Sequence, residues 1–250
     1  MTGALLLVPL VVRFLEVYGV GEVVPVRGPA AAPAAPTRRI PRPFEGKYPA
    51  TVACAILALA PFIVVTTARA LFGEQVQQDL HLSRSGMEII AGLSTAGYAW
   101  GALWGGDIAQ RLPRRPLFLV CEGVFVLGCL LAPVATGPVM YGIGHVLAGF
   151  ATGLLLVVAV PPVVQRFPAA KLPITVVAIN IGFFGAVCIG PLVGGWVAAG
   201  HHWRWFYAAL AALGFANLLL AVLTLPNQPP PDPGLRFDWA ALVLGLAATA

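Results

Sequence analysis

Charged side chains are scarce in this sequence. Asp, Glu, Lys and Arg together make up 10% of its 250 residues, whereas a soluble domain carries roughly 25%. So few charges cannot cover a water-facing surface, which excludes an ordinary soluble protein. The mean hydropathy of +0.87 agrees with this exclusion. We therefore expect the chain to present apolar surface to lipid.

The sequence also lacks the marks of a catalytic or metal site. Its four cysteines lie inside apolar stretches, without a Cys-x-x-Cys pair or a histidine at ligand spacing, which is typical of small packing residues. It has no His-Glu-x-x-His motif and no serine-nucleophile motif, and His201 and His202 stand as an isolated pair. We therefore expect no enzyme, no metal and no cofactor.

Long apolar stretches dominate what is present. Inside hydrocarbon only helices and closed barrels satisfy every backbone N–H and C=O group, and stretches of about 20 residues without alternation favour helices. We predict an all-α membrane protein whose six-helix transmembrane bundle covers residues 49–225, followed by the start of a seventh helix. The six predicted spans are 49–72, 87–110, 116–136, 138–164, 172–198 and 204–225.

The flanks of this bundle differ from it in composition. Residues 1–48 form an N-terminal arm, with a short apolar run that we expect to lie on the membrane surface and then a flexible basic segment. Residues 226–238 form a Pro-rich cytoplasmic linker. Residues 239–250 cover about 18 Å as a helix, short of the ~30 Å hydrocarbon core, so we expect a truncated seventh helix and a fragment or half-protein.

The net charge of +5 comes from basic residues in short loops between the spans. This placement argues against nucleic-acid binding and indicates topology instead. We predict a multi-pass protein of the cell membrane with a cytoplasmic N-terminus. The loops assigned to the cytoplasm carry Arg38, Arg39, Arg42, Lys47, Arg111, Arg114, Arg115, Arg166, Lys171 and Arg236, whereas the outer loops carry only Arg84 and Arg204.

The loop after the second span has two interpretations. The positive-inside rule alone explains its arginines, or they form a cytoplasmic gate that pairs with carboxylates or helix C-termini. The segment resembles the loop signature of the major facilitator superfamily, Gly-x-x-x-Asp-Arg-x-Gly-Arg-Arg. Gln110 replaces its acid and Pro113 its second glycine, and Asp107 lies one turn earlier as a stand-in. The candidate gate residues are Gly106, Asp107, Gln110, Arg111, Arg114 and Arg115.

The fifth span contains Gly190, Pro191, Gly194 and Gly195. Proline bends a membrane helix, and glycines let a neighbouring helix approach closely. The pattern is either an ordinary packing kink or, by its resemblance to the antiporter signature of the same superfamily, an antiporter-type kink.

A cluster of Trp203, Arg204 and Trp205 stands at the outer start of the sixth span and predicts an anchor at the membrane interface. It is similar to a Trp-Arg-Trp stretch of the 14-helix drug:proton antiporter branch. The resemblance covers residues 50–250 and implies the N-terminal half of such a transporter.

Ionisable groups inside the spans need a reason, because each costs about 2.5–3.5 kcal/mol at a helix centre. Arg69 lies near the predicted outer end of the first span and is expected to snorkel to the surface. Glu122 lies about 9 Å into the third span. It is either paired within the bundle, with the arginines of the loop as partners, or it is protonated and acts as a proton relay.

His145 is either a satisfied core residue or part of a substrate or coupling pathway. By resemblance to the fourth-helix motif of the family, His145 occupies the Arg position, Ala148 the Gln position and Gly149 the glycine. In the first helix Val65 stands where the branch has an acid, which weakens the expectation of proton coupling.

Gly97, Gly101 and Gly105 recur at intervals of four in the second span. Such a ridge is a packing surface, and in the superfamily it implies sliding contact with the opposite half.

The resemblance implies a secondary active transporter that exports a small organic or drug-like solute in exchange for protons. Its partners would be the lipid bilayer, the solute and protons, and transport would need the missing C-terminal half or a second chain. The alternative is a degenerate, non-transporting half that acts as a membrane scaffold or sensor, which the lost acids at Val65 and Gln110 favour.

Overall fold

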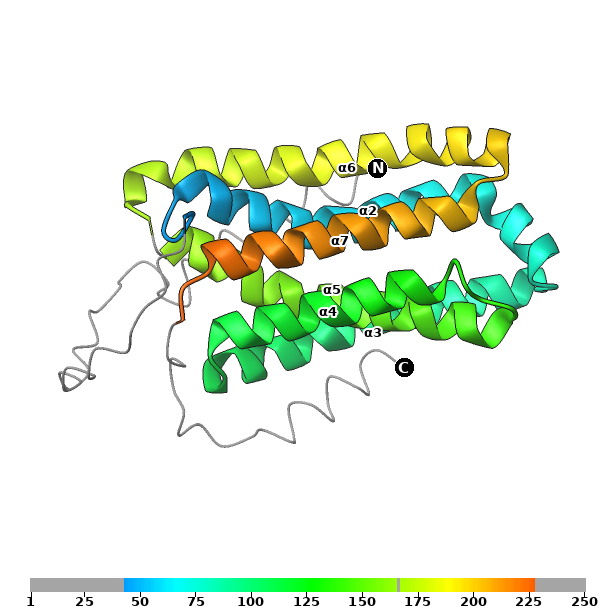
Figure 1. The fold of residues 1–250 in the computed structure, drawn as a ribbon, viewed down its shortest axis with the longest axis horizontal. Helices are drawn as coiled ribbons and strands as arrows, with labels where there is room; N and C mark the ends of the chain where they lie inside the picture. Colours follow the sequence, from blue (N-terminus) through cyan, green and yellow to red (C-terminus); the bar gives the residue numbers. More distant parts are fainter. Residues whose placement is uncertain (1–42, 166, 228–250) are drawn as a thin grey trace, which may run out of the picture. The chain divides into compact units, whose positions relative to one another are not determined.

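Six long helices make up the part of the chain that the computed structural model describes, residues 43–165 and 167–227 (Figure 1). No strand occurs among these residues, and the predicted all-α fold is confirmed. The predicted interfacial helix and seventh helix, together with most of the arm and linker, lie outside the described residues. The helices are α2 (Tyr48–Asp79), α3 (Arg84–Arg111), α4 (Arg114–Leu131), α5 (Pro138–Gln165), α6 (Leu172–Gly200) and α7 (Trp203–Thr224), with a short 3₁₀ turn η1 (Ala169–Lys171).

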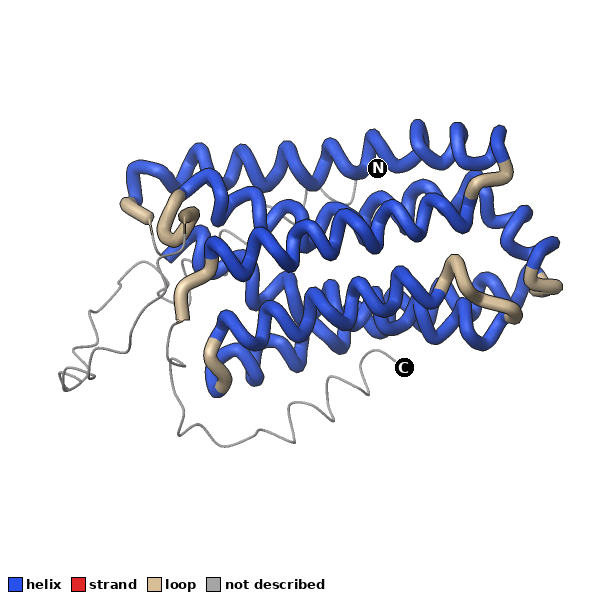
Figure 2. Tube along the Cα trace, in the orientation of Figure 1, coloured by secondary structure: helices blue, strands red, loops and turns tan. Residues whose placement is uncertain are grey.

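Four of the described helices, α2, α5, α6 and α7, are long and apolar enough to cross a membrane. Helix α3 has the length, but its glycines and its polar and aromatic side chains lower its mean hydropathy. Helix α4 has only 18 residues and includes three charged side chains, Arg114, Arg115 and Glu122. Both helices run alongside α5 (Figure 2).

The six helices form two sets of three that pack in matching ways. In the first set α2, α3 and α4 follow one another, and α5, α6 and α7 form the second set. Helix α3 packs on α5 as α6 packs on α2, and α4 packs on α5 as α7 packs on α2. The helices alternate in direction, so the loops 80–83, 132–137 and 201–202 share one end of the bundle (Figure 1).

The glycine ridge of α3 brings this helix against α5. A Cβ atom on Gly101 would collide with the Phe150 carbonyl and lie 2.9 Å from the Leu154 nitrogen, and one on Gly149 would collide with the Ser94 carbonyl. Backbone contact of this kind is available only to residues without a side chain. The ridge is thus occupied by a helix of its own bundle, and the expectation of sliding contact with an opposite half is wrong for these glycines.

Helix α6 packs on α2 in the same manner. A Cβ atom on Gly190 would collide with the Thr67 side chain, and one on Gly194 would lie 2.6 Å from the Ala68 carbonyl oxygen. Helix α6 runs unbroken through Pro191, and both Pro191 and Gly195 lie on its exposed side. Two of the four residues of the predicted kink therefore make a helix-packing surface.

Helix α2 continues seven residues beyond the predicted end at residue 72. Its polar last turns are tied to the second set, since Gln75 Nε2 donates to the Ala198 carbonyl at 2.5 Å. Arg69 therefore lies ten residues before the end of the helix at Asp79, about 15 Å along the axis. The 32 residues of α2 cover about 48 Å, more than the ~30 Å hydrocarbon core, so the helix end does not mark the membrane edge and the snorkelling of Arg69 stays a prediction.

Candidate functional site

Three polar side chains meet in the buried interior between α5 and α7. His145 Nε2 lies 2.9 Å from the Tyr141 hydroxyl and 2.7 Å from the Tyr207 hydroxyl, and the two hydroxyls are 3.0 Å apart. All three side chains are buried. Tyr141 and His145 are one turn apart on α5, so their side chains share a face. The three groups are thus within hydrogen-bonding distance of one another in the buried interior.

This triangle of Tyr141, His145 and Tyr207 is held from several helices. Ser94 Oγ on α3 donates to the His145 carbonyl at 2.9 Å, and Phe72 on α2 packs edge-on against the Tyr207 ring. The Arg69 guanidinium acts electrostatically on all three members. The cluster thus joins a cation on α2 to polar groups on α5 and α7.

A small void of about 10 Å³ adjoins the triangle, close to the smallest space that holds one water molecule. Val65, Cys129, His145, Ala148 and Tyr207 are among its lining residues. Three positions at which the sequence departs from the family pattern, Val65, His145 and Ala148, therefore line the same space.

Arg69 also lines a polar crevice of about 460 Å³ between α2 and the beginning of α3. Glu74, Arg84 and Glu88 lie along the same crevice. Arg84 and Glu88 form an exposed ion pair at 3.3 Å, whereas Arg69 Nη1 is buried and has no hydrogen-bond partner among the described residues. Arg69 thus places a cation in the lining of the crevice, while its buried Nη1 is an unused donor among the described residues.

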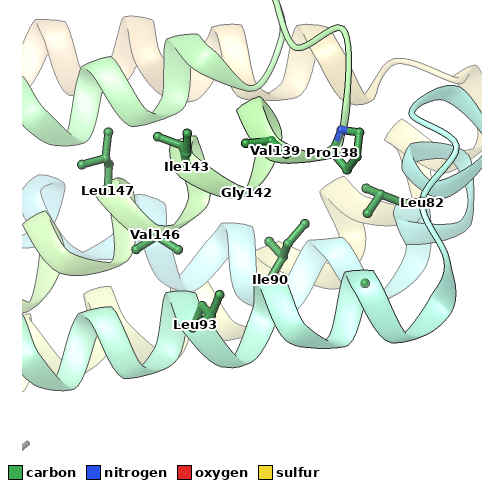
Figure 3. A pocket seen from close by; sticks show the side chains of 10 residues that line it. Leu82, Ile90, Leu93, Pro138, Val139, Gly142, Ile143, Val146 and Leu147 are labelled. Carbon is green, nitrogen blue, oxygen red and sulfur yellow. The ribbon is translucent and has the colours of Figure 1, made fainter.

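An apolar crevice of about 470 Å³ lies on the other side of α3. Ile90 and Leu93 rise from α3 toward Val146 on α5, and Leu82 and Pro138 border the crevice at the loops (Figure 3). Its ten lining residues include no charged side chain. The first turns of α3 therefore separate an apolar crevice from a polar one.

The Trp-Arg-Trp cluster divides between the interior and the surface. Trp203 is buried and its Nε1 donates to Asp79 Oδ2 at 2.7 Å. Arg204 lies over the Trp203 ring and donates to the Pro133 and Ala135 carbonyls beyond the end of α4. Only Trp205 is largely exposed, at 76%. The prediction of an interfacial anchor is therefore wrong for Trp203, because its indole is buried and its hydrogen bond to Asp79 joins α7 to α2.

The arginines beside the loop between α3 and α4 make one contact within a helix and one between two helices. Arg111 Nη2 donates to Asp107 Oδ1 at 2.6 Å within α3, so Asp107 supplies a carboxylate where the signature position holds Gln110. Gln110 donates to the Gly106 carbonyl instead. Arg115 Nη2 donates at 3.2 Å to the Val222 carbonyl in the last turn of α7, where the helix dipole favours a cation.

Glu122 is wholly buried in α4. Neither of its carboxyl oxygens has a hydrogen-bond partner in the described part of the chain. The predicted pairing of Glu122 with the arginines of the neighbouring loop is therefore absent from the described residues, because Glu122 faces α7 and the loop arginines have other contacts.

The predicted site residues thus fall into separate places. His145 and Gly149 lie in the interior of the bundle, the gate residues lie at the end that bears the α3–α4 loop, and Glu122 lies two turns into α4. Sequence reasoning missed Tyr141, Tyr207 and Ser94. The spacing of Tyr141 four residues before His145 was the one local signal, whereas the Tyr207 contact spans 62 residues of sequence.

Comparisons with known proteins agree with this architecture. A family model described as Major Facilitator Superfamily matches residues 48–246. The MFS-type transporter YubD of Bacillus subtilis is 27% identical over 200 residues, which cover 78% of this chain and 39% of that protein. A multidrug resistance protein B homolog of Mycobacterium tuberculosis is 26% identical over 231 residues, covering 89% of this chain and 42% of the relative.

Two further similarities extend the same pattern. The multidrug export protein EmrB of Escherichia coli is 25% identical over 146 residues, 57% of this chain and 28% of that protein. A crystal structure of the peptide transporter POT in complex with alafosfalin superposes with a TM-score of 0.61 at 16% identity, over 79% of this chain and 42% of the other. The chain spans about two fifths of the length of the first relatives that it matches.

Proposed function

Because this chain belongs to the major facilitator superfamily, we propose that it takes part in secondary active transport, exporting a small organic or drug-like solute in exchange for protons. The relatives named as multidrug resistance and multidrug export proteins support the solute class. The membrane would be the cell membrane. The basic residues before the first span and between the second and third spans support a cytoplasmic N-terminus; they are Arg38, Arg39, Arg42, Lys47, Arg111, Arg114 and Arg115.

The polar crevice lined by Arg69 is the observation that carries this proposal. Its volume of about 460 Å³ is within the range of small-molecule sites, and a charged wall is costly inside a membrane bundle unless it serves a ligand. Arg69 links the crevice electrostatically to Tyr141, His145 and Tyr207. A solute in the crevice and the hydrogen-bonded triangle can therefore influence each other through the Arg69 guanidinium. Gly149 contributes to this site by letting α5 lie against Ser94 on α3.

We propose further that the solute path lies between this bundle and a second one, supplied by a C-terminal half or another chain. Helix α6 packs mainly on α2, and large apolar side chains cover its other side, including Phe184 at 67%, Leu192 at 74% and Trp196 at 70% exposure. The α3–α4 loop, with Asp107, Arg111 and Arg115, would form the cytoplasmic gate of this half.

Flux measured in proteoliposomes tests the proposal. The complete gene product would be reconstituted and loaded with a panel of cationic, anionic and neutral amphipathic dyes, and an imposed pH gradient should drive export of at least one. The same vesicles with no gradient are the control. A folded, inserted protein that moves no dye in either direction would contradict transport and favour the scaffold or sensor.

A further inference from the structure

A carboxyl group without a partner lies at the centre of α4. Glu122 is the ninth of the 18 residues of this helix, about 12 Å from its first residue, and its side chain is 0% exposed. Neither carboxyl oxygen has a hydrogen-bond partner among the described residues. Burial is complete within the bundle itself, so it does not depend on the surrounding lipid.

Polar groups of α2 and α7 surround this carboxyl. The Asn217 side chain lies beside it, and Asn217 Nδ2 points to the Cys54 carbonyl at 3.4 Å. Asn217 Oδ1 and Thr224 Oγ1 are both buried without a hydrogen-bond partner in the described part of the chain. Asn217 and Thr224 are each 0% exposed. An unused carboxyl on α4 and an unused amide oxygen on α7 therefore lie beside each other.

The charge state of Glu122 follows from these neighbours. An ionised carboxylate buried without donors is several kcal/mol less stable than one in water. The titratable groups on which Glu122 acts electrostatically are the thiols of Cys54 on α2 and of Cys121 and Cys129 on α4, and the buried polar side chains of α7 on this side are the uncharged Asn217 and Thr224. No described Lys or Arg forms an ion pair with Glu122. A neutral Glu122 carries an O–H group. This group can donate a hydrogen bond to Asn217 Oδ1, which has no donor among the described residues.

We propose that Glu122 is a proton-binding site, whose neutral acid donates a hydrogen bond to Asn217 Oδ1 and so joins α4 to α7. One proton is bound, no other bond forms or breaks, and the proton passes to water when the seam between α4 and α7 opens. The seam is closed near the site, since a Cβ atom on Gly214 would lie 2.9 Å from Val126 Cγ2 and 3.2 Å from Phe125 Cδ1. Only the use of this proton in coupling rests on the proposed function.

Infrared spectroscopy of the full chain in liposomes tests the site without measuring transport. A neutral carboxylic acid has a carbonyl stretch separate from that of a carboxylate, and a solvent-exposed glutamate is neutral in only about one molecule in 500 at neutral pH. We expect a neutral-acid band at neutral pH that Glu122→Gln removes and that the matched control Glu88→Gln, at an exposed position, leaves in place. Asn217→Leu should move the band to higher frequency, because the acid loses its acceptor.

Two results would overturn the proposal. One is a spectrum at neutral pH in which the neutral-acid band is absent, and the other is a band that survives in Glu122→Gln. If Glu122→Gln fails to fold, the frequency shift in Asn217→Leu decides, and an unmoved band contradicts the bond to Asn217. A band that behaves as expected in a protein without solute flux would contradict the proposed function and leave the proton site standing, so the two failures are distinguishable.

Discussion

Val65 on α2 and His145 on α5 line the same water-sized void, although 80 positions separate them in the sequence. Both side chains are buried, at 3% and 5% exposure. The acid that the transporter branch carries at position 65 would thus have faced the residue at position 145. Val65 and His145, two departures from the family pattern, are thus neighbours in space and shape the same local environment.

This proximity predicts that an acid at position 65 interacts with the imidazole. We expect Val65→Asp to lower the unfolding free energy more when His145 is replaced by leucine than when His145 is present. A buried carboxylate without a partner is less stable than one that faces an imidazole. The coupling between the two changes should be about 0.5–3 kcal/mol, measured by thermal unfolding in detergent. Val65→Asn is the size-matched control, and equal losses in both backgrounds for Val65→Asp would contradict direct contact.

The hydrogen-bonded triangle predicts a specific cost for removing one hydroxyl. Tyr207→Phe deletes the contacts to His145 at 2.7 Å and to Tyr141 at 3.0 Å, and we expect a loss of about 1–3 kcal/mol in unfolding free energy. Tyr98→Phe is the control, because the Tyr98 ring stacks on Phe62 and its hydroxyl makes no hydrogen bond to a described residue. Similar melting temperatures for the two variants would contradict the hydrogen bonds that Tyr207 makes in the triangle.

The contact between α3 and α5 predicts different outcomes for two glycines of one helix. Gly101→Ala places a methyl group against the backbone of Phe150 and Leu154, whereas Gly92→Ala meets nothing within 4 Å. We expect a destabilisation of about 1–3 kcal/mol for the first change and none for the second, since alanine is a better helix former than glycine. Chemical denaturation in micelles measures both, and an unaffected Gly101→Ala would show that the helices lie further apart.

The unused donor of Arg69 predicts an effect on solute rather than on folding. Arg69→Gln should lower the affinity for an anionic or polar solute by about 10- to 150-fold, as expected for one charge-assisted hydrogen bond of about 1.5–3 kcal/mol. Arg84→Gln is the matched control, since Arg84 lines the same crevice with a side chain 89% exposed. The measurement is dye binding by fluorescence. Equal affinities for the two variants would contradict the prediction that Arg69 contacts the solute.

The membrane class, the six helices and most of their ends could be predicted from the sequence, because lipid requires long apolar helices whatever the fold around them. The ends of α2 and α4 were missed, since α2 continues to Asp79 and α4 ends at Leu131, five residues before the predicted end of its span. Hydropathy reports where lipid ends, but the polar turn through Gln75 and Asp79 is stabilised by Ala198 and Trp203, which follow more than a hundred residues later. The buried position of Trp203 could not be predicted for the same reason.

The sequence by itself determined that the chain is helical, lies in a membrane and carries the motif residues of its family, since these depend on composition and local spacing. Only the tertiary structure decided which residues meet. It placed Tyr207 on His145, set Val65 beside the same void and left Glu122 with Asn217 rather than with the loop arginines. Contacts between helices depend on how each helix is rotated toward its neighbours, and small residues such as Gly101 and Gly190 fix that rotation through backbone approach. The glycine spacing in the sequence marks a packing face on one helix, but it does not tell which helix lies against that face.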